Sequence, residues 1–198
     1  MGLISLKVRT LISGRGGLGV VEMGNMLAYL FMLNGFSTSV VPTYGPQTRG
    51  GFVESTVVIQ DEHVLNPIPT KFDMLIAMDL PALDRIKDLM SYGTIFFNSS
   101  LVNGNWPNSI QVPATEIAEK VAMNKIREPR VTSNVSMLGA ITKIMQFSKR
   151  DLDEPISNIL SDKPKQAIQL NIDIADAGYN YAEKELSTIK NPLDFFRK

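Results

Sequence analysis

Apolar residues change their spacing in a regular order along the first part of the chain. Residues 6–12 are rich in branched side chains and end at Ser13-Gly14, which predicts a strand that runs into a tight turn. Apolar residues then recur at spacings of three and four, as in a helix with one buried face, at Val20, Met23, Leu27, Leu30 and Phe31. Asn34-Gly35 is a helix stop signal, and residues 36–41 read as a second strand closed by Pro42. This order predicts a βαβ unit with parallel strands.

The rest of the chain continues the alternation and then becomes helical. Strand patterns cover residues 52–60, 74–78, 94–98 and 110–112, the last two separated by the turn-rich Asn103-Gly104-Asn105. Helical patterns cover residues 81–90, 115–126, 134–147 and 164–185. Residues 151–163 read as a polar connector without a clear period.

The fold expected from this order is α/β: a Rossmann-like, open, mostly parallel sheet flanked by helices, with a helical C-terminal tail. We expect one domain over residues 1–198, with an α/β core at 1–147 and a helical extension at 148–198. The final helix is too isolated to form a core of its own, so we expect it to pack on the sheet or on a partner.

Composition then removes several kinds of chemistry. The 198 residues hold no cysteine and one histidine, His63, so the chain itself supplies no thiolate, no iron–sulfur ligands and no His-rich metal site. Twenty Lys and Arg balance twenty Asp and Glu, which disfavours nucleic-acid binding. The most apolar stretch, residues 26–33, is far shorter than the roughly 20 residues of a membrane-spanning helix. No secretion signal is evident, and the expected location is the cytoplasm.

Glycines concentrate in two loops that carry the candidate chemistry. The first, Gly14-Arg15-Gly16-Gly17-Leu18-Gly19, contains Gly-x-Gly-x-x-Gly between a predicted strand and a predicted helix, the context of a dinucleotide-binding turn. The acidic residue that should hold a ribose after the second strand is missing; Val40 to Thr43 stand there. A sharp packing turn without a ligand, a phosphate site and a nicotinamide site therefore all stay open.

The second loop spans residues 42–51 and contains Tyr44, Gly45, Arg49, Gly50 and Gly51. Loops that follow parallel strands project at the same sheet edge, so we expect this loop beside Arg15 and the first turn. An arginine there suits carboxylate or phosphate recognition, while an ordered turn with a solvated arginine is the alternative. Asn134 is expected either to cap the helix that follows or to reach this loop site.

Together these motifs resemble a known family. Gly14-Arg-Gly-Gly-Leu-Gly-Val-Val21 and Pro42-Thr-Tyr-Gly-Pro-Gln-Thr-Arg-Gly-Gly51 resemble the gamma subunit of the 2-oxoacid:ferredoxin (or acceptor) oxidoreductases that act on pyruvate, 2-oxoglutarate or ketoisovalerate. The resemblance covers roughly residues 8–147 and includes Ser133-Asn-Val-Ser-Met-Leu-Gly-Ala140. Two departures lie in the loops: Leu18 stands where the family usually has Gln, and Gln47 where it commonly has Glu.

The resemblance implies an accessory chain of a complex that decarboxylates a 2-oxoacid oxidatively to an acyl-coenzyme A. Alpha and beta subunits, with a ferredoxin-like delta subunit as a further candidate, would carry the thiamine diphosphate and iron–sulfur clusters and pass electrons to ferredoxin. This chain would hold no metal, firm cofactor or catalytic residue, and its glycine loops would meet partner chains or share coenzyme A, with Arg15 and Arg49 supplying charge and the amides of Gly16, Gly17 and Leu18 supplying donors. A stand-alone nicotinamide or flavin oxidoreductase and a purely structural assembly module are the alternatives.

Overall fold

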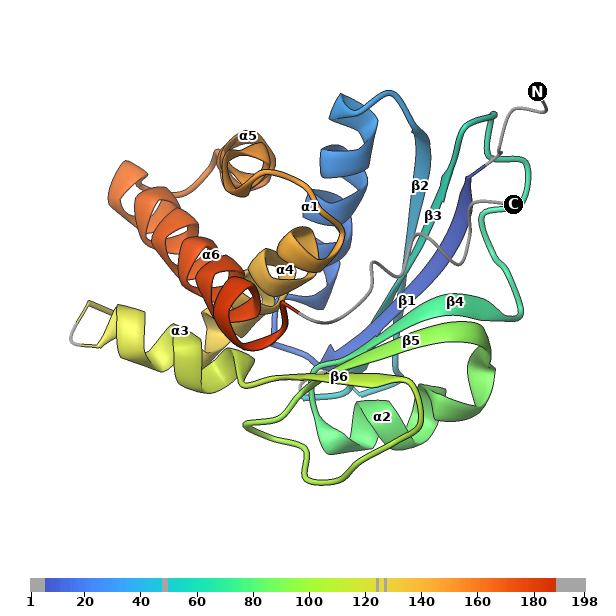
Figure 1. Cartoon of the computed structure of the whole chain (residues 1–198), viewed down its shortest axis with the longest axis horizontal. Coiled ribbons are helices and arrows are strands. Elements are labelled where there is room, and N and C mark those ends of the chain that lie inside the picture. The colour runs from blue at the N-terminus through green and yellow to red at the C-terminus, as the bar shows by residue number, and fades with distance from the viewer. Residues whose placement is uncertain (1–5, 48–49, 124, 127, 188–198) are drawn as a thin grey trace.

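The computed structural model describes residues 6–47, 50–123, 125–126 and 128–187. Six strands form one sheet in the order β2-β3-β1-β4-β5-β6 (Figure 1). Their bounds are Lys7–Arg15 for β1, Ser37–Tyr44 for β2, Phe52–Gln60 for β3, Phe72–Ala77 for β4, Met90–Asn98 for β5 and Ser109–Val112 for β6. The pairings β1–β4, β4–β5 and β5–β6 are parallel, whereas β3 runs antiparallel to both β1 and β2. The expected α/β class with a mostly parallel sheet is confirmed.

The expected βαβ unit is wrong in one respect, because β3 lies between β1 and β2. Residues 55–59 of β3 are buried on both faces of the sheet, whereas every residue of β2 is half-buried or exposed. A strand covered on both faces belongs inside a sheet, and a partly solvated strand suits its edge. The two strands therefore form a hairpin, in which the amide of Gly45 donates to the carbonyl of Phe52 at 2.9 Å.

Most helices cover one face of the sheet. Their bounds are Val20–Leu33 for α1, Leu80–Ile86 for α2, Ala114–Ala122 for α3, Ser133–Ile144 for α4, Asp153–Ile159 for α5 and Lys165–Glu185 for α6, with short 3₁₀ helices at Lys87–Leu89, Pro129–Thr132 and Lys149–Leu152. The larger apolar core joins α1, α4 and α6 to this face, and α2 covers a smaller core around Leu75 and Phe97 on the other face (Figure 1).

The segment predicted as a polar connector is in fact helical. Residues 149–152 form a 3₁₀ turn and 153–159 form α5, with Leu152 and Ile156 buried against the larger core. Pro155 lies in the first turn of α5, where its missing N–H leaves no intrahelical bond unmade. The apolar residues of such a short helix are too few to show a helical period, so the sequence pattern does not indicate it.

The long helix α6 packs on α4 rather than directly on the sheet. At their crossing a Cβ built on Gly139 would lie 2.0 Å from the carbonyl oxygen of Ala175, and one built on Gly178 would lie 2.0 Å from that of Ser136. Two glycines thus let the helix backbones touch, which fixes α6 beside the start of α4. None of the helices in the described part of the chain is long and apolar enough to cross a membrane.

Candidate functional site

The two glycine loops touch at the carboxyl edge of β1. The amide of Gly16 donates to the carbonyl of Gly51 at 2.8 Å, so the expected proximity of the loops is confirmed. Gly17 and Gly19 have φ angles of 93° and 65°, a region that L side chains avoid. The turn therefore depends on glycine at these positions for its backbone shape, whether or not a ligand binds.

The turn's own amides are less available than the motif indicates. The amide of Gly16 donates to the carbonyl of Gly51, and the amide of Leu18 donates to the carbonyl of Arg15 at 3.2 Å. These two amides are therefore engaged within the loops, and the role expected of them toward a ligand stays a prediction. The side chain of Leu18 is buried in the larger core, so this departure from the family pattern supplies packing rather than a polar contact.

Asn134 reaches the glycine turn instead of capping a helix. It lies inside α4, and its side-chain Nδ2 donates to the carbonyl of Gly19 at 3.0 Å. The capping interpretation is wrong, because Thr132 occupies the N-cap position. Gly19 is itself the N-cap of α1 and, as a glycine, supplies no side-chain hydrogen bond to that helix. Asn134 is 5% exposed, and its Oδ1 makes no hydrogen bond among the described residues.

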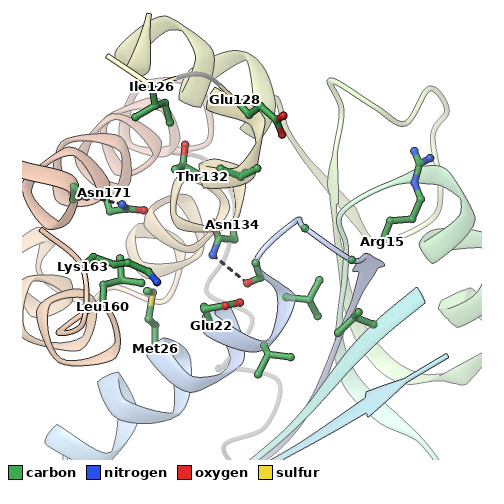
Figure 2. Close-up of a pocket in the computed structure, with 18 of the residues that line it drawn as sticks. Arg15, Glu22, Met26, Ile126, Glu128, Thr132, Asn134, Leu160, Lys163 and Asn171 are labelled. Atoms are coloured by element: carbon green, nitrogen blue, oxygen red, sulfur yellow. Dashed lines mark hydrogen bonds between the residues drawn. The ribbon is translucent and has the colours of Figure 1, made fainter. Parts of the chain in front are cut away.

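Arg15 leaves the turn on the opposite side from Asn134, as Figure 2 shows. Its Nε donates to Oδ2 of Asp79 at 2.7 Å, and the other carboxylate oxygen of Asp79 accepts from the amide of Ala82 at the start of α2. Asp79 is therefore the N-cap of α2. The arginine side chain is 61% exposed and the aspartate 1%, so a buried carboxylate orients an accessible guanidinium group.

A cavity of about 770 Å³ opens between the start of α1 and the C-terminal helices (Figure 2). Its walls are mostly apolar and include Met26, Leu160, Ala167 and Leu170. Glu22, Glu128 and Lys163 place charges around it, and Asn134 and Asn171 add amides. The pKa of Lys163 is raised, mainly by its hydrogen bond with Asp162 and to a smaller degree by Glu22.

The second loop meets this cavity through Tyr44. Tyr44 lines it and is exposed, whereas Gly45 and Gly51 shape the hairpin, and Gly50 has a φ of 67°. Thr48 and Arg49 lie outside the described residues, so the role expected of Arg49 stays a prediction.

Sequence reasoning missed the part of the cavity formed by the α5–α6 region. Leu160 and Lys163 fall in the segment interpreted as a connector, and Asn171 and Ala167 lie on a helix interpreted only as an amphipathic tail. The sequence signal for this region is Lys163-Pro164, because a proline indicates the start of a helix and places the charge of Lys163 beside it.

The groups around the cavity include carboxylates, an ammonium group and side-chain amides. Within the described ranges, no three His, Asp or Glu side chains gather as metal ligands, and the chain has no cysteine. His63 follows the end of β3 and is not among the residues that line the cavity. The arrangement therefore suits recognition of a ligand or a partner chain.

Residues 9–181 match the family model described as pyruvate ferredoxin/flavodoxin oxidoreductase. The match covers most of the chain, which therefore belongs to this family. The chain is similar to the ketoisovalerate oxidoreductase subunit VorA of Methanothermobacter thermautotrophicus, at 32% identity over 91% of this chain and 37% of VorA. It is also similar to the 2-oxoglutarate synthase subunit KorC of Methanocaldococcus jannaschii, at 29% identity over 91% of this chain and 97% of KorC.

Two solved structures share the fold. The 2-oxoglutarate:ferredoxin oxidoreductase from Magnetococcus marinus, with 2-oxoglutarate, coenzyme A and succinyl-CoA bound, superimposes with a TM-score of 0.80 at 19% identity, over 94% of this chain and 32% of that one. The gamma subunit of a keto/oxoacid ferredoxin oxidoreductase from Geobacter sulfurreducens superimposes with a TM-score of 0.68 at 24% identity, over 89% of this chain and 98% of that subunit. The chain thus spans about a third of the VorA and Magnetococcus chains, but nearly all of KorC and the Geobacter subunit.

Proposed function

We propose that this chain is the gamma-type subunit of a cytoplasmic 2-oxoacid:ferredoxin oxidoreductase complex. The observation that carries the proposal is the match to KorC over 97% of that subunit's length. The absence of cysteine from the sequence supports it, because iron–sulfur clusters must then be held by other chains. In this proposal, alpha and beta subunits, with or without a ferredoxin-like delta subunit, hold thiamine diphosphate and the clusters and reduce ferredoxin.

The role of this chain within the complex is proposed to be non-catalytic. It would act as a single domain of residues 1–198 whose glycine loops, at residues 14–19 and 42–51, face partner chains. In this proposal the 2-oxoacid is selected by the thiamine-bearing chains.

The test is reconstitution with the remaining subunits of the same complex. We expect 2-oxoacid-dependent, coenzyme A-dependent dye reduction to require this chain. Full activity of the complex without it would refute the proposal. Titration of the isolated chain with NAD, NADP and FMN in a calorimeter tests the alternative class, and tight binding of any of the three would favour a stand-alone oxidoreductase.

We further propose that the glycine loops share coenzyme A with the partner chains. The Magnetococcus enzyme with a similar fold has coenzyme A bound, although the low identity extends only the fold to this chain. The residues of this chain that fit the phosphate groups of coenzyme A are Arg15, whose guanidinium group is accessible at the turn, and Arg49. Phosphate recognition by paired guanidinium donors supports this assignment.

Separate measurements of the two substrates test this role. Arg15→Ala and Arg49→Ala should raise the apparent KM for coenzyme A and leave that for the 2-oxoacid unchanged. Arg150→Ala is the matched control, because Arg150 is exposed in the 3₁₀ turn before α5 and does not line the cavity. Equal changes for both substrates would assign the arginines to assembly instead.

A further inference from the structure

The chain contains two Asn-Gly dipeptides, Asn34-Gly35 and Asn103-Gly104, and the structure places them in opposite chemical situations. In an Asn-Gly pair the glycine amide nitrogen can attack the asparagine side-chain carbonyl carbon, because glycine has no Cβ to hinder the approach. Both asparagines are exposed, so solvent access does not distinguish them. The difference lies in the hydrogen bonds of the reacting groups.

Asn34-Gly35 is held at the end of α1. The asparagine Nδ2 donates to the carbonyl of Leu30 at 2.8 Å, and the amide of Gly35 donates to the carbonyl of Met32 at 3.1 Å. The leaving group and the attacking nitrogen are thus both engaged in the helix C-cap. Reaction there requires the end of the helix to open first.

Asn103-Gly104 lies in the irregular connection between β5 and β6. Among the described residues, neither the Asn103 side chain nor the Gly104 amide makes a hydrogen bond; only the Gly104 carbonyl is engaged, by Nε2 of Gln111 at 3.3 Å. The connection is anchored on each side of the pair, since Val102 is buried in the smaller core and Trp106 packs edge-on against Phe97. The reacting groups therefore sit free on a short exposed segment between fixed ends.

We propose that Asn103 is a site of spontaneous deamidation, with Asn34 protected by its cap. The Gly104 nitrogen forms a bond to Cγ of Asn103 and gives up its proton, and the side-chain nitrogen leaves as ammonia, which yields a cyclic succinimide. Water then opens one of the two imide bonds and gives aspartate or isoaspartate. No oxidation or reduction occurs, and water is the one co-reactant.

The modification changes this part of the molecule in two ways. It adds one negative charge to a chain whose formal net charge is zero. The isoaspartate product also inserts a methylene group into the main chain, directly before the carbonyl that Gln111 holds. The modified residue lies on the side of the sheet that α2 covers, away from the cavity at the start of α1.

The test follows both peptides of the folded full-length chain during incubation in mildly alkaline buffer. Peptide mapping by mass spectrometry measures the mass increase from Asn to Asp, and an isoaspartate assay measures the rearranged product. We expect deamidation at Asn34 to be about tenfold slower than at Asn103, since two hydrogen bonds must open there. In urea, where the cap is lost, the two rates should become similar.

Equal rates in the folded chain, or a faster reaction at Asn34, would overturn the proposal. Asn103→Gln should abolish the early acidic species seen by ion exchange, whereas Asn34→Gln should leave it unchanged. An acidic species that persists in Asn103→Gln would also contradict the assignment. Substitution of Gly104 is not a suitable control, because its φ is 147° and a Cβ added there would lie 2.5 Å from the Trp106 ring, which would strain any other residue.

Discussion

The side-chain amide of Asn134 donates to the carbonyl of Gly19 at 3.0 Å, across 115 positions of sequence. This bond ties the start of α4 to the N-cap of α1, and both residues line the cavity. The same carbonyl accepts the first intrahelical bond of α1, from the amide of Met23 at 2.9 Å. One backbone oxygen thus joins the glycine turn, the first helix and the C-terminal helical layer.

Asn134→Ala should lower the free energy of unfolding by about 1 kcal/mol, the usual net value of one buried hydrogen bond. The loss is limited because Gly19 keeps its bond to Met23 and because the unpaired Oδ1 of Asn134 is removed as well. Asn134→Asp should be more destabilising, since a carboxylate would face the carbonyl of Gly19 without a proton to donate. Urea unfolding measures the free energy of unfolding of both variants. Equal stability of the two would contradict the hydrogen bond from Asn134 to Gly19.

Gly19→Ala combines two separable costs. A left-handed backbone costs a residue with a Cβ about 1–2 kcal/mol, and a Cβ on Gly19 would lie 2.3 Å from Nδ2 of Asn134. In an Asn134→Ala background the steric part disappears while the backbone part stays. We therefore expect a double-mutant cycle to give a coupling of about 1–3 kcal/mol, favouring the double variant. Strict additivity would show that the two residues do not touch.

Gly139→Ala should destabilise the chain even though alanine is the better helix former. The gain in helix propensity is about 1 kcal/mol, but the new Cβ would press on the backbone of Ala175, which cannot rotate away. Forced overpacking of this kind costs about 1–3 kcal/mol or more, so we expect a net loss in thermal and urea unfolding. Gln166→Ala, on an exposed position of α6, should change stability by less than about 0.5 kcal/mol.

The order and type of the elements follow from local pattern, whereas their neighbours in the sheet do not. The apolar spacing at the start of the chain indicates β1 and α1 because the pattern is local. The position of β3 between β1 and β2 depends on which strand is covered on both faces. That coverage comes from helices that lie later in the sequence, so the local pattern does not show it. The alternating residues of β3 do not reveal a buried second face.

The candidate site divides in the same way. The glycine turn and its contact with the second loop could be predicted because glycine, strand and helix signals are adjacent in sequence. The Asn134 contact is one of two alternatives, since an asparagine near a helix start also indicates a cap. Asn171 gives no signal and Lys163 only that of a helix start at Lys163-Pro164, because tertiary packing alone brings the α5–α6 region to the start of α1.

Burial should separate two ion pairs of equal length. Arg15 with Asp79 and Lys120 with Glu116 both measure 2.7 Å, but Asp79 is buried whereas Lys120 and Glu116 are exposed. Arg15→Ala leaves the buried carboxylate with the helix cap as its main partner, and we expect a loss of about 1–2 kcal/mol. Lys120→Ala should cost about 0.3–0.5 kcal/mol. Similar losses in urea unfolding would show that Asp79 is solvated.

Asp153 should make stability fall as the pH rises through the acid range. Burial raises the pKa of this carboxyl group, with a smaller contribution from the charge of Asp176 and partial compensation by Arg150 and Lys149. The folded chain therefore binds more protons than the unfolded chain between the unfolded pKa and the raised folded value, so the stability decreases with pH in that interval. Above this pH interval, Asp153→Asn should be more stable than the parent protein. It should lose this advantage below about pH 3.5.

Asp162→Asn provides a control of opposite sign. The hydrogen bond from Lys163 lowers the pKa of Asp162, so its contribution to stability is present above the unfolded pKa and is lost as the pH falls through the folded value. Asp162→Asn should therefore be slightly less stable than the parent at neutral pH and approach it in acid. Urea unfolding between about pH 3 and 7 measures both variants. Because both carboxyl groups are largely in solvent, the effects are small, and the opposite signs are the decisive result: shifts in the same direction would contradict the assigned causes.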